Sequence, residues 1–118
     1  MPEFADHAAQ YLAAWNEHDV DAIRDHLESS VNPEVIFSDP ANRTVGIDAL
    51  AALIGEARRD LPDAVYGQTS ALDGGHDARY RYTWEVRTGG ETIPGMDCTT
   101  VDDQNRFLRI DGFFGPLS

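Results

Sequence analysis

Lysine is absent from this chain of 118 residues, and cysteine occurs only once, at Cys98. A single cysteine excludes an internal disulfide, a cysteine-based zinc ribbon and a CxxC redox motif. Long hydrophobic runs are lacking too, so no segment is expected to cross a membrane as a helix. The acidic N-terminal residues lack the basic and apolar regions of a signal peptide. We therefore expect a cytoplasmic protein.

Positive charge is scarce as well. Nine arginines stand against 21 acidic residues, which gives a formal net charge of −12. Such a polyanion repels phosphate backbones and anionic lipids, so we expect no binding to nucleic acid or to a membrane surface. Two alternatives explain this composition: adaptation to high salt, or a codon bias that replaces lysine by arginine. Because 42% of the residues are hydrophobic, the chain can bury a core, and we expect one domain over residues 1–118.

Apolar residues recur at helical spacing in the first half of the chain. This spacing predicts three helices, over about residues 3–17, over about residues 19–30 and between Gly46 and Pro62. Asp19 is the expected N-cap of the second helix. A short strand over residues 35–37 follows that helix and ends at Asp39-Pro40, because proline cannot continue a central ladder.

After Pro62 the apolar period changes to two, which is typical of strands. We predict four strands, over about residues 64–71, 78–88, 91–101 and 106–114. Turns rich in glycine, aspartate or asparagine separate them. Helices first and hairpin-linked strands afterwards indicate an α+β domain, in which the helices pack on one face of a curved antiparallel sheet.

The first long hairpin has a predicted register. A two-residue turn at Gly89-Gly90 pairs Trp84 with Gly95 on the facing strand. Two residues further along, Tyr82 pairs with Asp97. Because side chains alternate along a strand, all four residues share one face of the sheet, and a slip of one residue would turn them all to the other face.

The second hairpin extends this face. A four-residue turn at residues 102–105 pairs Asp97 with Ile110. Phe107 and Phe113 then point to the outer face, and exposed aromatic residues there predict a homodimer through that face. The inner face, toward the helices, collects Tyr80, Tyr82, Trp84, Val86, Ile93, Gly95, Asp97, Thr99, Val101, Leu108, Ile110, Gly112 and Phe114.

Asp97 is the one charged residue on this otherwise apolar and aromatic face. A buried carboxylate is unfavourable, so we expect a raised pKa, a hydrogen-bond partner, or both. Its cross-strand neighbour Tyr82 is a candidate partner. Gly95 opposite Trp84 predicts open space beside the indole, as a ligand cavity would need. The alternative interpretation is that Asp97 is a structural, hydrogen-bonded core residue.

Other polar residues carry weaker signals when they are taken alone. An Asp-Pro pair such as Asp39-Pro40 is common turn chemistry after a strand. Tyr11 lies on the apolar side of the first helix, where a tyrosine is usually a core residue with an anchored hydroxyl. Residues 73–77 lack the full ligand series of a calcium loop and are interpreted as a turn. The histidines are dispersed, so no metal site is expected; they are His7, His18, His26 and His76.

Several segments together resemble the cone-fold superfamily of nuclear-transport-factor-like, or SnoaL-like, proteins. They are residues 11–23, 37–40, 45–50, 79–84, 95–97 and 111–115. The resemblance covers nearly the whole chain and implies a cystatin-like cone whose helices and sheet enclose a pocket. It is specific for the fold and not for the function, because the superfamily includes isomerases, cyclases, epoxide hydrolases, transport adaptors and ligand binders.

The pattern of site residues is most similar to that of ketosteroid isomerases. In that family an Asp before a Pro, after the first strand, is the general base, and Asp39-Pro40 matches it. A Tyr on the first helix and a protonated Asp on a late strand form the oxyanion hole, and Tyr11 and Asp97 match those positions. The resemblance thus implies that Asp39 moves a proton on carbon while Tyr11 and Asp97 donate hydrogen bonds to the enolate oxygen.

We therefore expect a cofactor-free, metal-free enzyme that transfers a proton on a small, mostly apolar carbonyl compound, by isomerisation or by cyclisation. The residues expected to contact the substrate are Trp15, Tyr82, Trp84, Gly95, Ile110 and Phe114. Two alternatives stay open: a ligand-binding module without chemistry, and a dimeric interaction domain that works through its outer sheet face. An enzyme predicts that Asp39, Tyr11 and Asp97 converge on one open cavity.

Overall fold

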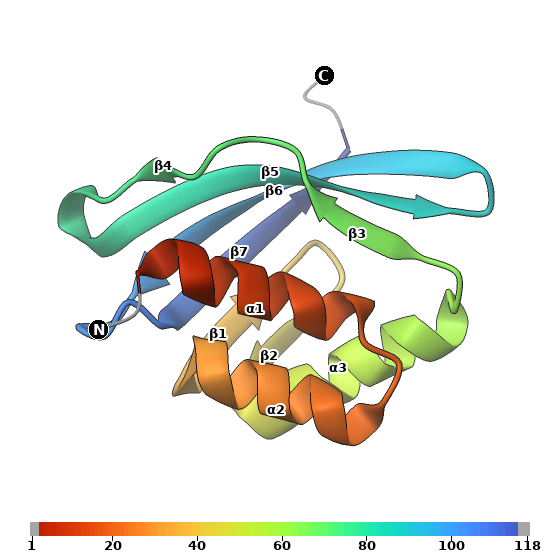
Figure 1. Ribbon diagram of the computed structural model, residues 1–118, viewed down its shortest axis with the longest axis horizontal. Helices are drawn as coiled ribbons and strands as arrows, with labels where there is room; N and C mark the ends of the chain where they lie inside the picture. The colour runs from red at the N-terminus through yellow and green to blue at the C-terminus, as the bar shows by residue number, and fades with distance from the viewer. Residues whose placement is uncertain (1–2, 116–118) are drawn as a thin grey trace.

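The computed structural model describes residues 3–115. Three helices agree with the predicted ones: α1 (Phe4–Asn16), α2 (Val20–Ser30) and α3 (Ile47–Asp60). Figure 1 shows α1 lying across one face of a curved sheet, with α2 and α3 below it. The predicted N-cap of α2 is confirmed, because the side chain of Asp19 accepts a hydrogen bond from the backbone N–H of Asp21 at 2.9 Å.

The buried residues of α1 repeat at helical spacing, so one side of the helix faces the sheet. They are Phe4, His7, Ala8, Tyr11 and Ala14. A capping box between Glu3 and Asp6 holds the N-terminus of the helix. Tyr11 is consequently fixed in the middle of α1 with its ring directed into the space under the sheet.

Seven strands form one sheet: β1 (Val31–Ser38), β2 (Arg43–Val45), β3 (Val65–Gln68), β4 (Asp73–Gly74), β5 (Arg79–Thr88), β6 (Glu91–Val101) and β7 (Phe107–Phe114). Their order is β2-β1-β7-β6-β5-β3, and β4 pairs with β5. A short 3₁₀ turn, His76–Ala78, precedes β5. The strand predicted at residues 35–37 is the second half of the longer β1.

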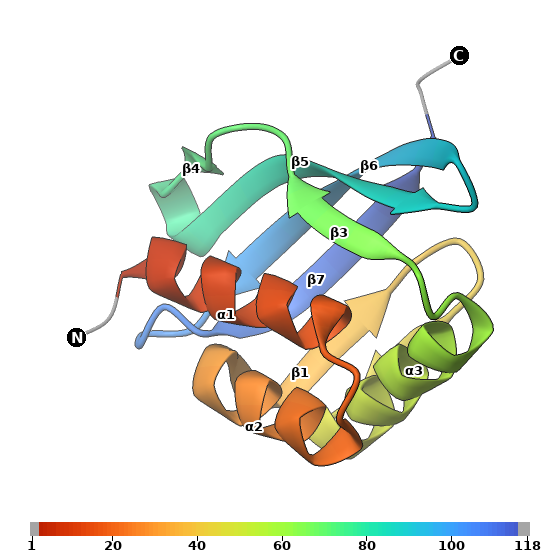
Figure 2. The same cartoon turned by 45° about the vertical axis from the view of Figure 1, so that its right-hand side comes forward.

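The sheet is mostly antiparallel, as predicted, with one parallel pair that the sequence did not predict. The exception is the parallel pair of β1 with β7. Turn patterns reveal pairing only between strands that follow each other in the chain, and these two strands are separated by most of it. Figure 2 shows the curvature of the sheet, with the edge strand β3 reaching the C-terminal end of α1. No helix in the described range is long and apolar enough to cross a membrane.

The predicted register of β5 and β6 is confirmed, since Trp84 lies opposite Gly95 and Tyr82 opposite Asp97. The predicted register of β6 and β7 is wrong. The turn is one residue longer than predicted, so that Val101 pairs with Phe107 instead of Arg106, and a bulge between Thr100 and Val101 adds a second residue of shift. Asp97 consequently faces Gly112 instead of Ile110. The shift at Asp97 amounts to two residues, so Ile110, Gly112 and Phe114 still point to the inner face.

The longer turn also reverses the faces of the two residues at the start of β7. Phe107, predicted on the outer face, is fully buried, and its ring centroid lies 5.0 Å from that of Phe4 and 4.8 Å from that of Tyr11. Leu108, predicted inside, is exposed. Phe113 is exposed as predicted. Of the two aromatic residues on which the expected homodimer interface was based, only Phe113 lies exposed on the outer face. The homodimer stays a prediction.

Candidate active site

A cavity of about 480 Å³ lies between α1, α3 and the concave face of the sheet. Its walls are mostly apolar and aromatic, as is usual for small-molecule sites. The lining residues are Ala8, Tyr11, Leu12, Trp15, Phe37, Asp39, Asn42, Leu53, Ala57, Leu61, Tyr66, Gln68, Tyr82, Trp84, Val86, Ile93, Asp97, Gly112 and Phe114. All three residues predicted to be catalytic are among them.

Asp97 lies on β6 with 7% of its surface exposed. Both carboxylate oxygens accept hydrogen bonds: Oδ2 from the hydroxyl of Tyr82 at 2.8 Å, and Oδ1 from the indole Nε1 of Trp84 at 3.0 Å. Burial raises the pKa of Asp97 to about 6, the negative charge of Asp39 adds to the rise, and the two donors oppose it. The carboxyl can therefore both release and take up a proton near neutral pH.

The partner Tyr82 agrees with the prediction, but Trp84 is a second donor that the sequence reasoning missed. Its signal was present, because residues diagonal across an antiparallel pair lie within reach of a long side chain. The prediction that Gly95 leaves open space beside the indole is wrong, because a Cβ at Gly95 would overlap the Trp84 ring itself. The indole thus occupies the place of the missing side chain, and Phe114 packs edge-on against it at 5.7 Å between ring centroids.

Asp39 follows the end of β1 in a tight turn. Its Oδ1 accepts hydrogen bonds from the backbone N–H of Ala41 at 2.9 Å and of Asn42 at 2.8 Å. The side-chain amide of Asn42 adds a third, at 3.1 Å, and reaches Oδ2 only at 3.4 Å. One oxygen of Asp39 is thus fixed by its own turn, as is typical of an Asx turn, while the other has a single long contact and can accept further hydrogen bonds.

Gly112 separates the two carboxylates. A Cβ at this position would lie 3.2 Å from Oδ1 of Asp97 and 3.8 Å from the Cβ of Asp39. No side chain therefore stands between Asp97 and Asp39 at this point. The register of β6 and β7 is responsible, because the longer turn and the bulge together bring Gly112 opposite Asp97 in place of Ile110.

Tyr11 completes the polar end of the cavity. Burial raises the pKa of its hydroxyl well above the ordinary value, and the charges of Asp97 and Asp39 raise it further, against the opposing effect of Trp15. The hydroxyl is therefore protonated at every physiological pH and can donate a hydrogen bond. Its pKa responds to both carboxylates, which places all three groups in one electrostatic environment.

Of the residues predicted to contact a substrate, four line the cavity: Trp15, Tyr82, Trp84 and Phe114. Two do not. Gly95 lies beneath the Trp84 indole, and Ile110 is fully buried in the hydrophobic core. Both point to the inner face, as predicted, but a residue on that face reaches the cavity only where no other side chain covers it.

Three polar lining residues were not anticipated from the sequence: Asn42, Tyr66 and Gln68. Tyr66 and Gln68 alternate along β3, so the period-two pattern of residues 64–71 held the signal. Asn16 fixes this strand to the end of α1, because its side-chain amide donates to the backbone oxygen of Tyr66 and accepts from its N–H, both at 2.8 Å. The ring of Tyr66 lies 5.2 Å from that of Trp15.

Within residues 3–115, no three His, Cys, Asp or Glu side chains are grouped so that they could hold a metal ion. The polar end of the cavity consists of two carboxylates in different surroundings and a neutral phenol. Such a set can take a proton from a carbon acid and donate a hydrogen bond to the oxygen on which negative charge develops.

Comparison with known proteins places this chain in a family. A model described as the SnoaL-like domain matches residues 8–110. A "putative isomerase of the SnoaL-like family" from Agrobacterium tumefaciens is 26% identical with a TM-score of 0.87, over 98% of this chain and 100% of that one. A "putative polyketide cyclase" from Sinorhizobium meliloti is 20% identical with a TM-score of 0.70, over 95% and 94%.

A protein of unknown function with a cystatin-like fold, from Methylobium petroleophilum, is 14% identical with a TM-score of 0.80, over 98% of this chain and 77% of that one. At such low identity the likeness concerns the fold alone. No curated protein matches the sequence. Because the family model covers most of the chain, this protein belongs to the SnoaL-like domain family and has its cystatin-like α+β fold.

Proposed function

We propose that this protein is an enzyme that transfers a proton at the carbon next to the carbonyl group of a small, mostly apolar compound. The observation that carries the proposal is the presence of Asp39, Tyr11 and Asp97 on one apolar cavity. An apolar environment strengthens every hydrogen bond made to a developing oxyanion, so few polar groups suffice.

In the proposed first step, a carboxylate oxygen of Asp39 takes the proton from the carbon. The electrons of the C–H bond form a C=C bond, and the carbonyl π electrons move to the oxygen. Tyr11 donates a hydrogen bond to that oxygen, and Asp97 donates a second one in its protonated form. With a pKa of about 6, Asp97 is partly protonated near neutral pH, and an oxyanion beside it favours the protonated form.

The enolate then has two outcomes. Return of the proton from Asp39 to a different carbon of a conjugated enolate gives a double-bond isomer. Attack of the enolate carbon on a second carbonyl carbon closes a ring and leaves an alkoxide, which takes up the proton held by Asp39. The similar proteins from A. tumefaciens and S. meliloti carry the names of these two activities. Both reactions need the same carboxylate and the same oxyanion donors, so one site supports either.

A ligand-binding module without chemistry is the second candidate. It is favoured by the finding that both oxygens of Asp97 already accept hydrogen bonds from Tyr82 and Trp84, as they would in a purely structural role. The two candidates differ in whether a bound ketone exchanges hydrogen with the solvent.

Deuterium exchange tests the proposal. An uncharged bicyclic ketone with acidic α-hydrogens, such as 2-tetralone, is incubated with the protein in D₂O, and incorporation is followed by NMR. We expect exchange well above the buffer rate, with a loss of about 10-fold or more in Tyr11→Phe. A ketone that binds to the protein but exchanges only at the buffer rate would favour the ligand-binding module.

A further inference from the structure

The cavity contains negative charge without any positive charge. Among its lining residues, all of which lie in the described range, Asp39 and Asp97 are acidic and none is Arg, Lys or His. In a protein with a net charge of −12 an acidic surface is expected, but a pocket wall with two carboxylates and no cation constrains what can bind there.

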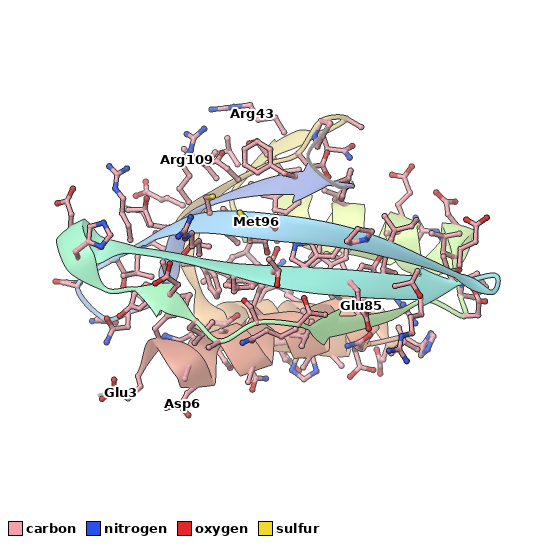
Figure 3. The ribbon with its side chains drawn as sticks, turned by 90° about the horizontal axis from the view of Figure 1, so that it is seen from above. Glu3, Asp6, Arg43, Glu85, Met96 and Arg109 are labelled. Atoms are coloured by element: carbon pink, nitrogen blue, oxygen red, sulfur yellow. The ribbon has the colours of Figure 1, made fainter. Side chains whose placement is uncertain are left out.

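The arginines are engaged elsewhere. Six pair with carboxylates that do not line the cavity, namely Arg24, Arg79, Arg81, Arg87, Arg106 and Arg109. Arg58 is buried and donates to the backbone oxygens of Ala64 and Pro62. Arg43 and Arg59 are exposed. Figure 3 shows Arg43 and Arg109 on the side of the sheet away from α1. Neither residue lines the cavity.

The apolar walls of the cavity strengthen electrostatic interactions between the charges inside it. Aromatic rings such as those of Trp15, Phe37 and Tyr66 replace water around the ligand. In such surroundings the charge of Asp39 already disfavours the ionised form of Asp97. A third negative charge would meet both carboxylates; at about 6 Å and an effective dielectric constant of about 20, one such repulsion corresponds to about 100-fold in affinity.

We propose that the cavity selects its ligands by charge: it accepts uncharged compounds and organic cations and rejects carboxylates, phosphates and other anions. This inference rests on the proposed function for the identity of the site and adds the class of its substrate. The proposed proton transfer agrees with it, since the negative charge moves from Asp39 to the enolate oxygen and the total charge in the cavity stays constant.

The inference also constrains the preceding reaction. A precursor with a free carboxylate would have to be esterified, amidated or decarboxylated before it enters this cavity. Cationic ligands gain from the same arrangement, because an ammonium group is attracted both to the carboxylates and to the faces of the aromatic rings.

Three ligands with one bicyclic frame test the proposal: 2-acetylnaphthalene, 2-naphthoate and 2-naphthylmethylammonium. Their dissociation constants are measured by calorimetry or NMR at about pH 8, well above the pKa of about 6 of Asp97. We expect the naphthoate to bind at least about 30-fold more weakly than the ketone, and the ammonium compound at least as tightly as the ketone. Naphthoate binding within threefold of the ketone, or no binding of ketone and ammonium compound at millimolar concentration, would overturn the inference.

Variants locate the effect. Asp39→Asn keeps an oxygen for the turn hydrogen bonds and removes one charge, so the ratio of naphthoate to ketone dissociation constants should fall by about 10- to 100-fold, the upper value corresponding to one full repulsion. Asp73→Asn, which removes an exposed carboxylate paired with Arg81 outside the cavity, should leave the ratio unchanged. An unchanged ratio in Asp39→Asn would contradict the inference.

The two proposals can fail independently. Charge selection without deuterium exchange would refute the proposed function alone. Deuterium exchange together with tight naphthoate binding would refute the charge selection alone.

Discussion

The indole Nε1 of Trp84 donates a hydrogen bond to Oδ1 of Asp97 across two strands, at 3.0 Å. Gly95 makes this contact possible, because the indole occupies the place that a side chain there would fill. This hydrogen bond joins β5 to the one buried carboxylate of the cavity, which lies on β6. Its removal has the clearest expected consequences of any change in the site.

Loss of the indole donor should raise the pKa of Asp97. Trp84→Phe keeps an aromatic ring but removes the N–H that favours the ionised carboxylate, so we expect the pKa to rise above about 6. Titration of the Asp97 carboxyl carbon by ¹³C NMR measures it. Trp15→Phe changes the other cavity tryptophan, which does not bond to Asp97, and should leave this pKa unchanged. An equal shift in both variants would contradict the assigned role of Trp84.

The stability of the protein should depend on pH through Asp97. Since burial raises its folded-state pKa from 3.8 to about 6, its contribution is present in full below about pH 4 and is lost as the pH rises through about 6. Relative to Asp97→Asn, the wild-type free energy of unfolding should therefore fall by about 2–3 kcal/mol between about pH 4 and pH 8. Urea unfolding across this range measures the difference.

Asp111→Asn provides a control of opposite sign. Partial burial of Asp111 raises its pKa, but hydrogen bonds from Arg109 and Ser38 outweigh this effect and hold the pKa below the ordinary value. Wild type should thus lose stability relative to this variant as the pH falls below about 4. The same pH dependence in both variants would show that Asp97 is not the group responsible.

Substitution of Gly95 should cost stability, whereas substitution of another strand glycine should not. The methyl group in Gly95→Ala overlaps the Trp84 indole, and we expect a loss of about 1–3 kcal/mol in the free energy of unfolding. Gly67→Ala is the matched control, because a Cβ at Gly67 on β3 meets nothing within 4 Å. Chemical denaturation of both variants decides the point, and equal stabilities would contradict the packing described here.

Gly112→Ala should affect ligand binding and activity more than folding. The added methyl group lies 3.2 Å from Oδ1 of Asp97, in the space between the two carboxylates. We expect a weaker affinity for 2-acetylnaphthalene and a slower ketone exchange, with a loss of stability smaller than that of Gly95→Ala. A variant with wild-type affinity and exchange rate would show that this space is not part of the binding site.

Most of the fold could be predicted from the sequence, because helical and strand periodicities are local properties. The Gly89-Gly90 turn gave the register that joins Tyr82 to Asp97 correctly. The parallel pair of β1 with β7 could not be predicted in this way, since no turn connects the two strands. The bulge at Thr100 and Val101 was missed as well, because the alternation of apolar residues does not reveal an extra residue.

The candidate site was predictable in its residues and not in its contacts. Asp39, Tyr11 and Asp97 were singled out by burial arguments and by a family resemblance, and all three line one cavity. The role of Gly112 depends on the longer turn and the bulge between β6 and β7, and the donor Trp84 depends on the rotamer that an indole adopts above Gly95. Both are consequences of packing between distant segments, which a one-dimensional pattern does not encode.

Hydrogen exchange in Asp39→Asn tests the central claim most directly. The rate of deuterium incorporation into 2-tetralone is compared for wild type, Asp39→Asn and the outer control Asp73→Asn, with ketone affinity measured in parallel. If Asp39 takes the proton, the first variant should lose exchange by about 100-fold or more while it still binds the ketone, and the control should keep the wild-type rate. Exchange by Asp39→Asn at the wild-type rate would contradict the account.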